Sequence, residues 1–133
     1  MTTRTMLKSK IHRARVTDCN IDYEGSITID PILLKAGDIL PYERVEIVNI
    51  NNGARFSTYV IEGQHPGNGD ICLNGAAARL ASKDDIVIII TYHEVPNDEC
   101  RHLKPRIVHV DAQNHITSTK NVDAWMDDLI SAK

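Results

Sequence analysis

The sequence predicts an all-β protein, a closed barrel with only short helices between its strands. Short runs rich in β-branched residues follow one another at close spacing, and turn signals separate them. The helical segments between these runs are no more than a turn or two long. Closing the sheet on itself removes exposed sheet edges, so this spacing favours a barrel. The 133 residues fit one domain, 1–133.

The first part of the chain is expected to hold two strands and one helix. Ile11 to Thr17 interleaves β-branched and polar residues, which is typical of a half-buried strand. SITID, residues 26–30, is a second short strand. PILLKAGD predicts a short helix with Pro31 at its first position and Gly37 past its end.

The middle of the chain predicts a hairpin followed by a short strand. RVEIVNI, residues 44–50, alternates as a strand, and Asn51-Asn52-Gly53 is a tight-turn signal. RFSTYVIEG, residues 55–63, is the returning strand. ICLNG, residues 71–75, is expected to form another strand after a polar loop.

The last part alternates helix and strand. AAARLASK is expected to form one or two helical turns, and DDIVIIITYHEV a long buried strand that ends at Pro96. Residues 106–116 predict one more strand and a turn. NVDAWMDDLISAK predicts a terminal helix with one apolar face: Val122, Trp125, Met126, Leu129 and Ile130.

Composition narrows the class of partner. A net charge of −3 provides no field that would attract nucleic acid or an anionic membrane, so a small ligand or a protein partner is favoured. Cys19, Cys72 and Cys100 are odd in number and far apart, which disfavours a disulfide scaffold or a zinc site. With neither a signal peptide nor a long apolar span, we expect a soluble cytoplasmic protein.

The conventional catalytic motifs are absent. GxSxG, a Walker A loop, HExxH and GxGxxG do not occur, and the six histidines show no metal-ligand spacing. His12 could orient a ligand or be structural. Gly75 to Ala78 could serve helix packing or expose backbone N–H groups to an anion. Gly25-Ser26 could be an ordinary turn.

Five segments in order resemble the bacterial pyruvoyl-dependent aspartate decarboxylase family: TMLKSKIHRARVT, YEGSITID, NNGARFSTYVIEG, LNGAAARLAS and DDIVIIITY. The resemblance runs from Arg4 to about Tyr92. It implies a double-psi β-barrel and a homotetramer with active sites between subunits.

The resemblance gives Gly25-Ser26 a chemical meaning. It implies a proenzyme that cleaves itself between these residues into a β chain, 1–25, and an α chain, 26–133. Ser26 would become a covalent pyruvoyl group, whose ketone forms a Schiff base with the substrate amine, with no metal and no pyridoxal phosphate. Gly25 would permit the strained geometry of the attack. Whether cleavage is spontaneous or needs a maturation factor stays open.

The resemblance also implies roles for other residues. Tyr59 would return a proton to carbon, and Thr58 would polarise the Gly25 carbonyl during processing. The implied substrate-binding residues are Lys10, Arg55, Thr58, Asn74, Gly75, Ala76 and Ala77. Arginine and lysine suit the two carboxylates of an acidic amino acid.

The function implied is decarboxylation of L-aspartate to β-alanine and CO₂, for pantothenate and coenzyme A synthesis. One alternative is a pyruvoyl-dependent decarboxylase of another acidic amino acid such as glutamate, because one methylene changes binding by only about 1–3 kcal/mol. Another alternative is a non-catalytic barrel that serves as a binding module.

Overall fold

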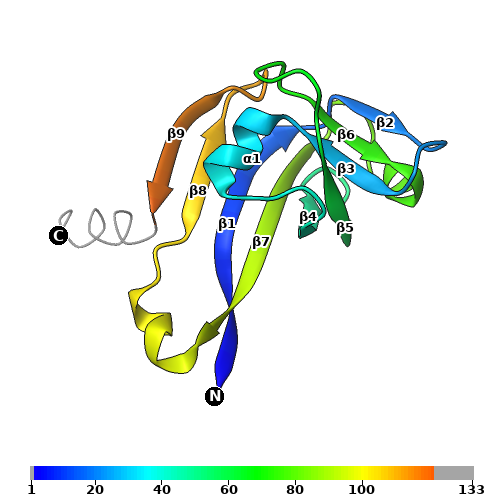
Figure 1. Cartoon of the computed structure of the whole chain (residues 1–133). Helices are drawn as coiled ribbons and strands as arrows, with labels where there is room; N and C mark the ends of the chain where they lie inside the picture. Colours follow the sequence, from blue (N-terminus) through cyan, green and yellow to red (C-terminus); the bar gives the residue numbers. More distant parts are fainter. Residues whose placement is uncertain (1, 122–133) are drawn as a thin grey trace.

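The protein is a strand-rich molecule with three short helical segments, seen in a computed structural model that describes residues 2–121 (Figure 1). The strands are β1 (Thr3–Arg15), β2 (Asp18–Asn20), β3 (Ser26–Ile29), β4 (Arg44–Asn49), β5 (Arg55–Glu62), β6 (Ile71–Asn74), β7 (Ile86–Pro96), β8 (Arg106–Val110) and β9 (Ile116–Asn121). The helical segments are α1 (Pro31–Gly37) and the 3₁₀ helices η1 (Gly75–Leu80) and η2 (Asn97–His102). The predicted terminal helix lies outside the described residues.

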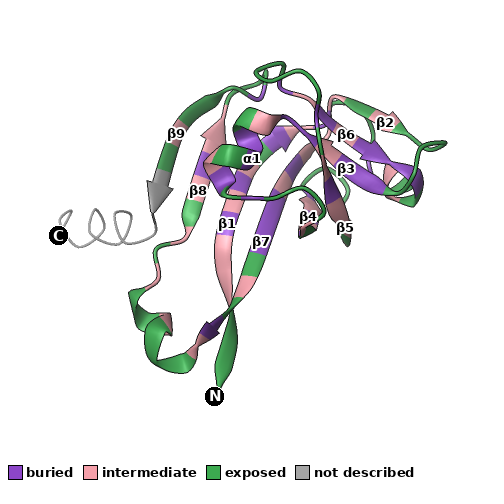
Figure 2. Cartoon of the chain, viewed as in Figure 1, coloured by how far each residue is buried: buried purple, intermediate pink, exposed green. Residues whose placement is uncertain are grey.

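All nine strands belong to one mixed sheet, in the order β2-β6-β3-β5-β4-β7-β1-β8-β9. Three of the pairings are parallel, namely β2 with β6, β3 with β5 and β1 with β8. The sheet curls around an apolar core, and Figure 2 shows buried residues gathered where β1, β3, β6 and β7 approach one another. The all-β barrel prediction is confirmed.

Strand β1 is longer than its hydrophobic pattern predicts. It begins at Thr3 rather than Ile11 and ends at Arg15 rather than Thr17. Its pairing with β7 shifts register between Leu7 and Ser9, and again between Ile11 and Ala14. Such bulges break the two-residue alternation on which a strand prediction depends.

Helix α1 begins as predicted and ends one residue later. Pro31 follows Asp30, whose side chain accepts a hydrogen bond from the Ile32 nitrogen at 2.9 Å, a typical helix N-cap. Gly37 is the last helical residue, and Asp38 takes the left-handed capping position with φ 54°.

The predicted β4–β5 hairpin is present, with the two strands antiparallel and Gly53 in its turn at φ +76°. The segment predicted as one or two helical turns is the 3₁₀ helix η1. Strands β2 and β9 and helix η2 were not predicted as separate elements. Among the residues described, no helix has the length and apolarity needed to cross a membrane.

Candidate active site

The Gly25-Ser26 pair lies where the chain enters strand β3. That strand has neighbours on both sides, β6 antiparallel and β5 parallel (Figure 1). Ser26 is opposite Asn74 of β6, and Ile27 is beside Val60 of β5. The first residue of the predicted α chain is therefore paired with β6, and the residue after it is paired with both neighbouring strands.

The Ser26 hydroxyl is buried and held by hydrogen bonds on two sides. Its exposed fraction is 0%. Its Oγ donates to the Glu24 carbonyl oxygen at 3.0 Å and accepts from Asn74 Nδ2 at 3.0 Å. Asn74 Nδ2 also donates to Thr28 Oγ1 at 3.0 Å, and Cys72 Sγ donates to Asn74 Oδ1 at 3.1 Å. This network fixes the amide of Asn74 with its nitrogen toward Ser26.

Glycine is sterically required at Gly75 rather than at Gly25. Gly75 has φ +64°, and a Cβ placed there would lie 2.7 Å from both the nitrogen and the Cα of Gly25. At Gly25 an added Cβ would meet nothing within 4 Å, and its φ is not in the left-handed region. The left-handed backbone beside the predicted cleavage point therefore belongs to Gly75, and the strained geometry expected at Gly25 does not appear in its φ.

Strand β5 carries three of the predicted site residues on its two faces. Its register with β4 is continuous, so side chains alternate regularly. Phe56 and Val60 pack toward the core, which places Thr58 on that face and puts Arg55 and Tyr59 together on the other. The expectation that Arg55 and Tyr59 share a face agrees with this alternation. The Thr58 hydroxyl has no hydrogen-bond partner among the described residues.

The two predicted carboxylate-binding cations lie apart from Ser26 within one chain. Lys10 is on β1, four positions from β3 in the order of the sheet. Arg55 is four residues before Tyr59 along β5, roughly 13 Å at the usual rise of a strand. It has no ion-pair partner among the described residues. Of the other basic residues near the N-terminus, Lys8 pairs with Glu43 at 2.6 Å and Arg15 with Asp84 at 2.6 Å.

A cavity of about 310 Å³ adjoins the Ser26 network on the side of β2 and β6. Its lining consists of Thr17, Asp18, Asn20, Tyr23, Thr28, Asp70, Cys72 and Asn74. Asp18 and Asp70 make it acidic, which suits a dicarboxylate substrate poorly. Burial and the neighbouring Asp18 raise the pKa of the Cys72 thiol, so the thiol stays protonated as a hydrogen-bond donor to Asn74.

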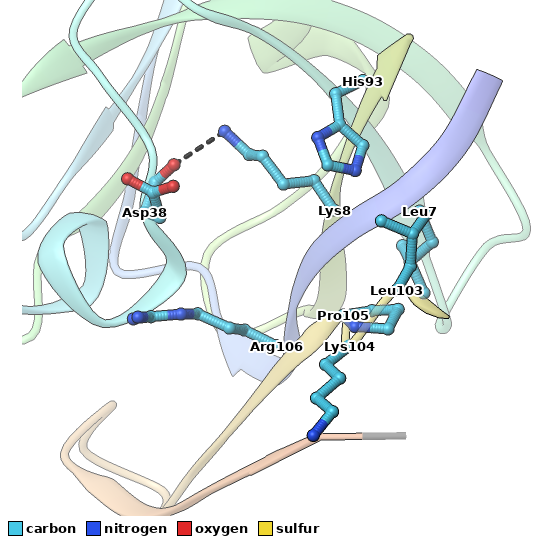
Figure 3. A pocket seen from close by; sticks show the side chains of 8 residues that line it. All are labelled: Leu7, Lys8, Asp38, His93, Leu103, Lys104, Pro105 and Arg106. Atoms are coloured by element: carbon cyan, nitrogen blue, oxygen red, sulfur yellow. Dashed lines mark hydrogen bonds between the residues drawn. The ribbon is translucent and has the colours of Figure 1, made fainter. Parts of the chain in front are cut away.

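A second cavity, of about 190 Å³, lies on the β1 and β8 side (Figure 3). It is lined by Leu7, Lys8, Asp38, His93, Leu103, Lys104, Pro105 and Arg106. Lys8 Nζ donates to the Asp38 carbonyl oxygen at 2.7 Å, and Arg106 donates to the Ala36 carbonyl oxygen at 3.1 Å. Two of its cationic side chains therefore donate hydrogen bonds to carbonyl groups at the C-terminal end of helix α1. None of the predicted site residues lines this cavity.

Two histidines that are far apart in the sequence meet in the structure. His12 of β1 and His109 of β8 are register partners, with ring centroids 5.4 Å apart at 67°. Burial, together with the charges of His109, Lys10 and Arg13, lowers the pKa of His12 below its ordinary value of 6.5. Within residues 2–121, no cluster of three or more His, Cys, Asp or Glu side chains could hold a metal ion.

Over most of its length the chain is similar to known proteins of one family. The family model described as aspartate decarboxylase matches residues 1–117. The chain belongs to the aspartate decarboxylase family. It is 61% identical over 113 residues to aspartate 1-decarboxylase of Syntrophomonas wolfei, covering 85% of this chain and 95% of the relative. To the same-named protein of Syntrophotalea carbinolica it is 52% identical over 129 residues, covering 97% and 98%.

All the residues that were predicted for the site lie within the matched range, residues 1–117. Within one chain the structure joins Ser26 directly to Asn74 and packs Gly75 against Gly25, while Tyr59 lies on the neighbouring strand. Two further residues of this region were not predicted. Cys72 orients Asn74, and Tyr42 stacks on Tyr59. For Tyr42, the Pro-Tyr pair at a turn was the available signal.

Proposed function

We propose that this protein converts L-aspartate to β-alanine and CO₂, using a pyruvoyl group that it makes from its own Ser26. The observation that carries the proposal is the buried Gly25-Ser26 junction, where the Ser26 hydroxyl is held by Asn74 in a chain of this family. β-Alanine is a precursor of pantothenate, so the product would supply coenzyme A synthesis. The free Cys19, Cys72 and Cys100 suit a reducing cytoplasm.

Self-cleavage would begin at the Ser26 hydroxyl. Its oxygen attacks the Gly25 carbonyl carbon, and the amide nitrogen leaves as an amine, so the amide becomes an ester. Loss of the proton on the Ser26 Cα expels the Gly25 carboxylate and leaves a dehydroalanine. Addition of water and release of ammonia then give the pyruvoyl group. Before the attack, the hydroxyl must leave the Glu24 carbonyl, to which it donates at 3.0 Å.

The surroundings of Ser26 fit a small polar group at this position. Asn74 Nδ2 already donates to the Ser26 oxygen and would donate equally well to a carbonyl oxygen there. The pyruvoyl ketone would supply an electrophilic carbonyl that takes the substrate amine and accepts the electron pair released as CO₂ leaves.

The remaining chemistry belongs to ordinary side chains. Tyr59, beside the Ser26 strand, would hold a proton on its hydroxyl and donate it to the substrate carbon. Arg55 and Lys10 would bind the carboxylates, the first through a planar fork and the second as a point charge. The backbone of Gly75, Ala76 and Ala77 would complete the substrate site.

The positions of the cations support a site shared between chains of a homotetramer. Lys10 lies four strand positions from Ser26, and the cavity beside Ser26 is acidic. A second copy could bring its own cations to this place. Exposed apolar side chains are available for such a contact, among them Tyr23, Leu40 and Tyr92.

The test is intact-mass spectrometry of the purified protein. One sample is incubated alone and a second with a lysate of cells that make this enzyme, because such a lysate could supply a maturation factor. We expect fragments of 25 and 108 residues (133 − 25), the larger with the mass of a pyruvoyl terminus. Ser26→Ala should stay whole, and Ser57→Ala, a serine on β5, should be cleaved like the wild type.

Turnover of aspartate and of glutamate is then measured on the cleaved protein. β-Alanine formed from aspartate supports the proposal, and equal rates on glutamate would instead favour a general acidic amino acid decarboxylase. A wild-type chain that stays whole under both conditions contradicts the pyruvoyl mechanism.

A further inference from the structure

Tyr42 occupies a backbone conformation that a bulky residue rarely adopts. Its φ is +71°, in the left-handed region where glycine and asparagine are the usual residues. The Glu43 nitrogen donates to the Leu40 carbonyl oxygen at 3.1 Å, so Leu40 to Glu43 form a four-residue turn with Pro41 second and Tyr42 third. Positive φ at the third position is the mark of a type II turn, in which glycine or asparagine is favoured.

The turn is held firmly in spite of this strain. The Glu43 side chain accepts from the Leu40 nitrogen at 3.0 Å and from Lys8 Nζ at 2.6 Å. The Tyr42 nitrogen donates to the Val60 carbonyl oxygen at 2.7 Å, and the Val60 nitrogen donates to the Glu43 carbonyl oxygen at 3.0 Å. The backbone of Tyr42 is therefore docked on the residue that follows Tyr59.

Core packing does not account for a tyrosine at this position. The residue is 80% exposed, yet its ring stacks on Tyr59 with centroids 6.5 Å apart and 30° between the planes. A stacked aromatic pair contributes about 0.5–1.5 kcal/mol, which is comparable to the cost of left-handed backbone for such a residue. The left-handed backbone of Tyr42 therefore places its ring in a packing contact with Tyr59.

We infer that Tyr42 is a positioning residue, which holds the Tyr59 ring so that its hydroxyl points where the substrate carbon needs a proton. The inference rests on the role proposed for Tyr59. A tyrosine on the open face of a strand can take several rotamers, and a ring fixed against one side of it removes some of them. Tyr42 contributes its ring and needs no hydroxyl for this purpose.

The experiment compares Tyr42→Gly and Tyr42→Phe as cleaved enzymes. Tyr42→Gly should be cleaved like the wild type and should unfold at the same or a higher temperature, because glycine suits the turn. Its kcat for aspartate should fall about 3- to 10-fold with a smaller change in KM, which corresponds to one aromatic pair. Tyr42→Phe keeps the ring and should restore kcat.

Asp84→Gly is the matched control. Asp84 has φ +76° and is the third residue of the turn from Ser82 to Asp85, on an exposed loop. Glycine relieves the same backbone strain there, and the ion pair with Arg15 that it also removes involves no predicted site residue, so kcat should not change. A wild-type kcat in Tyr42→Gly overturns the inference, as does a Tyr42→Phe that is as slow as Tyr42→Gly. An altered assembly mass of Tyr42→Gly in light scattering also overturns it, in favour of a subunit contact.

Tyr59→Phe separates this inference from the function on which it rests. If Tyr59→Phe is slow and Tyr42→Gly is normal, only the inference fails. If Tyr59→Phe has the kcat of the wild type, the proposed role of Tyr59 is wrong, and the inference about Tyr42 is wrong as well. If the inference is correct, Tyr42→Gly lowers kcat when it is made in the wild-type enzyme but not when it is made in the Tyr59→Phe variant.

Discussion

At the scale of single residues, the closest constraint on the predicted cleavage point comes from a residue 50 positions away in the chain. Gly75 touches the backbone of Gly25, so even one methyl group there must displace the segment that carries the scissile carbonyl. The Ser26 hydroxyl is bonded through Asn74, which precedes Gly75. Attack geometry and steric fit therefore both depend on the end of strand β6.

We expect Gly75→Ala to fold but to cleave itself slowly. A displacement of about 1 Å at reacting atoms can lower a rate by about 10²-fold, so the half-time of cleavage should lengthen by a factor of that order. The measurement is the fraction of cut chain against time on denaturing gels. Gly53→Ala is the control, because Gly53 also has positive φ, +76°, but open space around it. Equal cleavage rates in the two variants would contradict a steric role.

The residues around Ser26 could be predicted only in part from the sequence. Resemblance to the family indicated Ser26, Asn74 and Tyr59 by their motifs. Tyr42 acts through Tyr59, which is distant along the chain, and no periodicity reports such a contact. Cys72 is only two residues from Asn74, but its role depends on the contact of Asn74 with Ser26, which is distant along the chain. Single tyrosines and cysteines are also common in turns and strands, so the role of each could be inferred only from the three-dimensional structure.

At the scale of elements, the prediction succeeded where a strand has one buried face and failed where it has bulges. Strands β4 and β5 alternate regularly and were predicted almost to the residue. In β1 the first three residues are exposed and the next three are half-buried, so its first half carries no alternation, and register shifts follow after Leu7. Strand β2 has three residues, too few for any pattern.

Burial of His12, next to His109 where β1 pairs with β8, makes the stability of the protein depend on pH. Because the pKa of His12 is lowered in the folded protein, the unfolded chain binds the proton of His12 at a higher pH than the folded chain does. Stability should therefore fall as the pH drops below about 6.5, where the unfolded state takes up more protons. The neighbours that favour the neutral ring are His109, Lys10 and Arg13.

This expectation is tested by thermal unfolding between pH 7.5 and 5 in the uncut Ser26→Ala chain. His12→Gln should lose less melting temperature on acidification than its parent. His65→Gln, on the exposed loop after β5, controls for the loss of one imidazole. A parallel pH dependence for His12→Gln and its parent would refute the contribution of the histidine pair.

At the scale of the whole molecule, the order of strands in the sheet explains why a single chain does not bring all the predicted site residues together. Lys10 and Ser26 are 16 residues apart in the chain but four strands apart in the sheet. The short distance between Lys10 and Ser26 along the sequence did not indicate their separation in the sheet. If the sites form between subunits, Lys10 and Ser26 of one site come from different chains.

Mixed assemblies test this arrangement. Ser26→Ala lacks the pyruvoyl precursor, and Lys10→Ala should lose about 30- to 1,000-fold in kcat/KM through one missing charged contact. When the two are co-expressed in equal amounts, random pairing should restore about a quarter of the wild-type sites. Ser26→Ala mixed with the Ser26→Ala/Lys10→Ala double variant should stay inactive. Failure to recover activity in verified mixed assemblies would place both residues in one chain.

The position of Gly25-Ser26 in the sheet also determines what a cut there does to refolding. The 1–25 piece would carry β1, which lies between β7 and β8, and β2, which pairs with β6. Both pieces would thus remain interlocked after the bond is broken, but once unfolded they would separate as independent molecules. Refolding would change from a first-order to a second-order reaction, and the apparent stability of the cut protein would depend on its concentration. Cleavage would leave the native structure in place while making its loss hard to reverse in dilute solution.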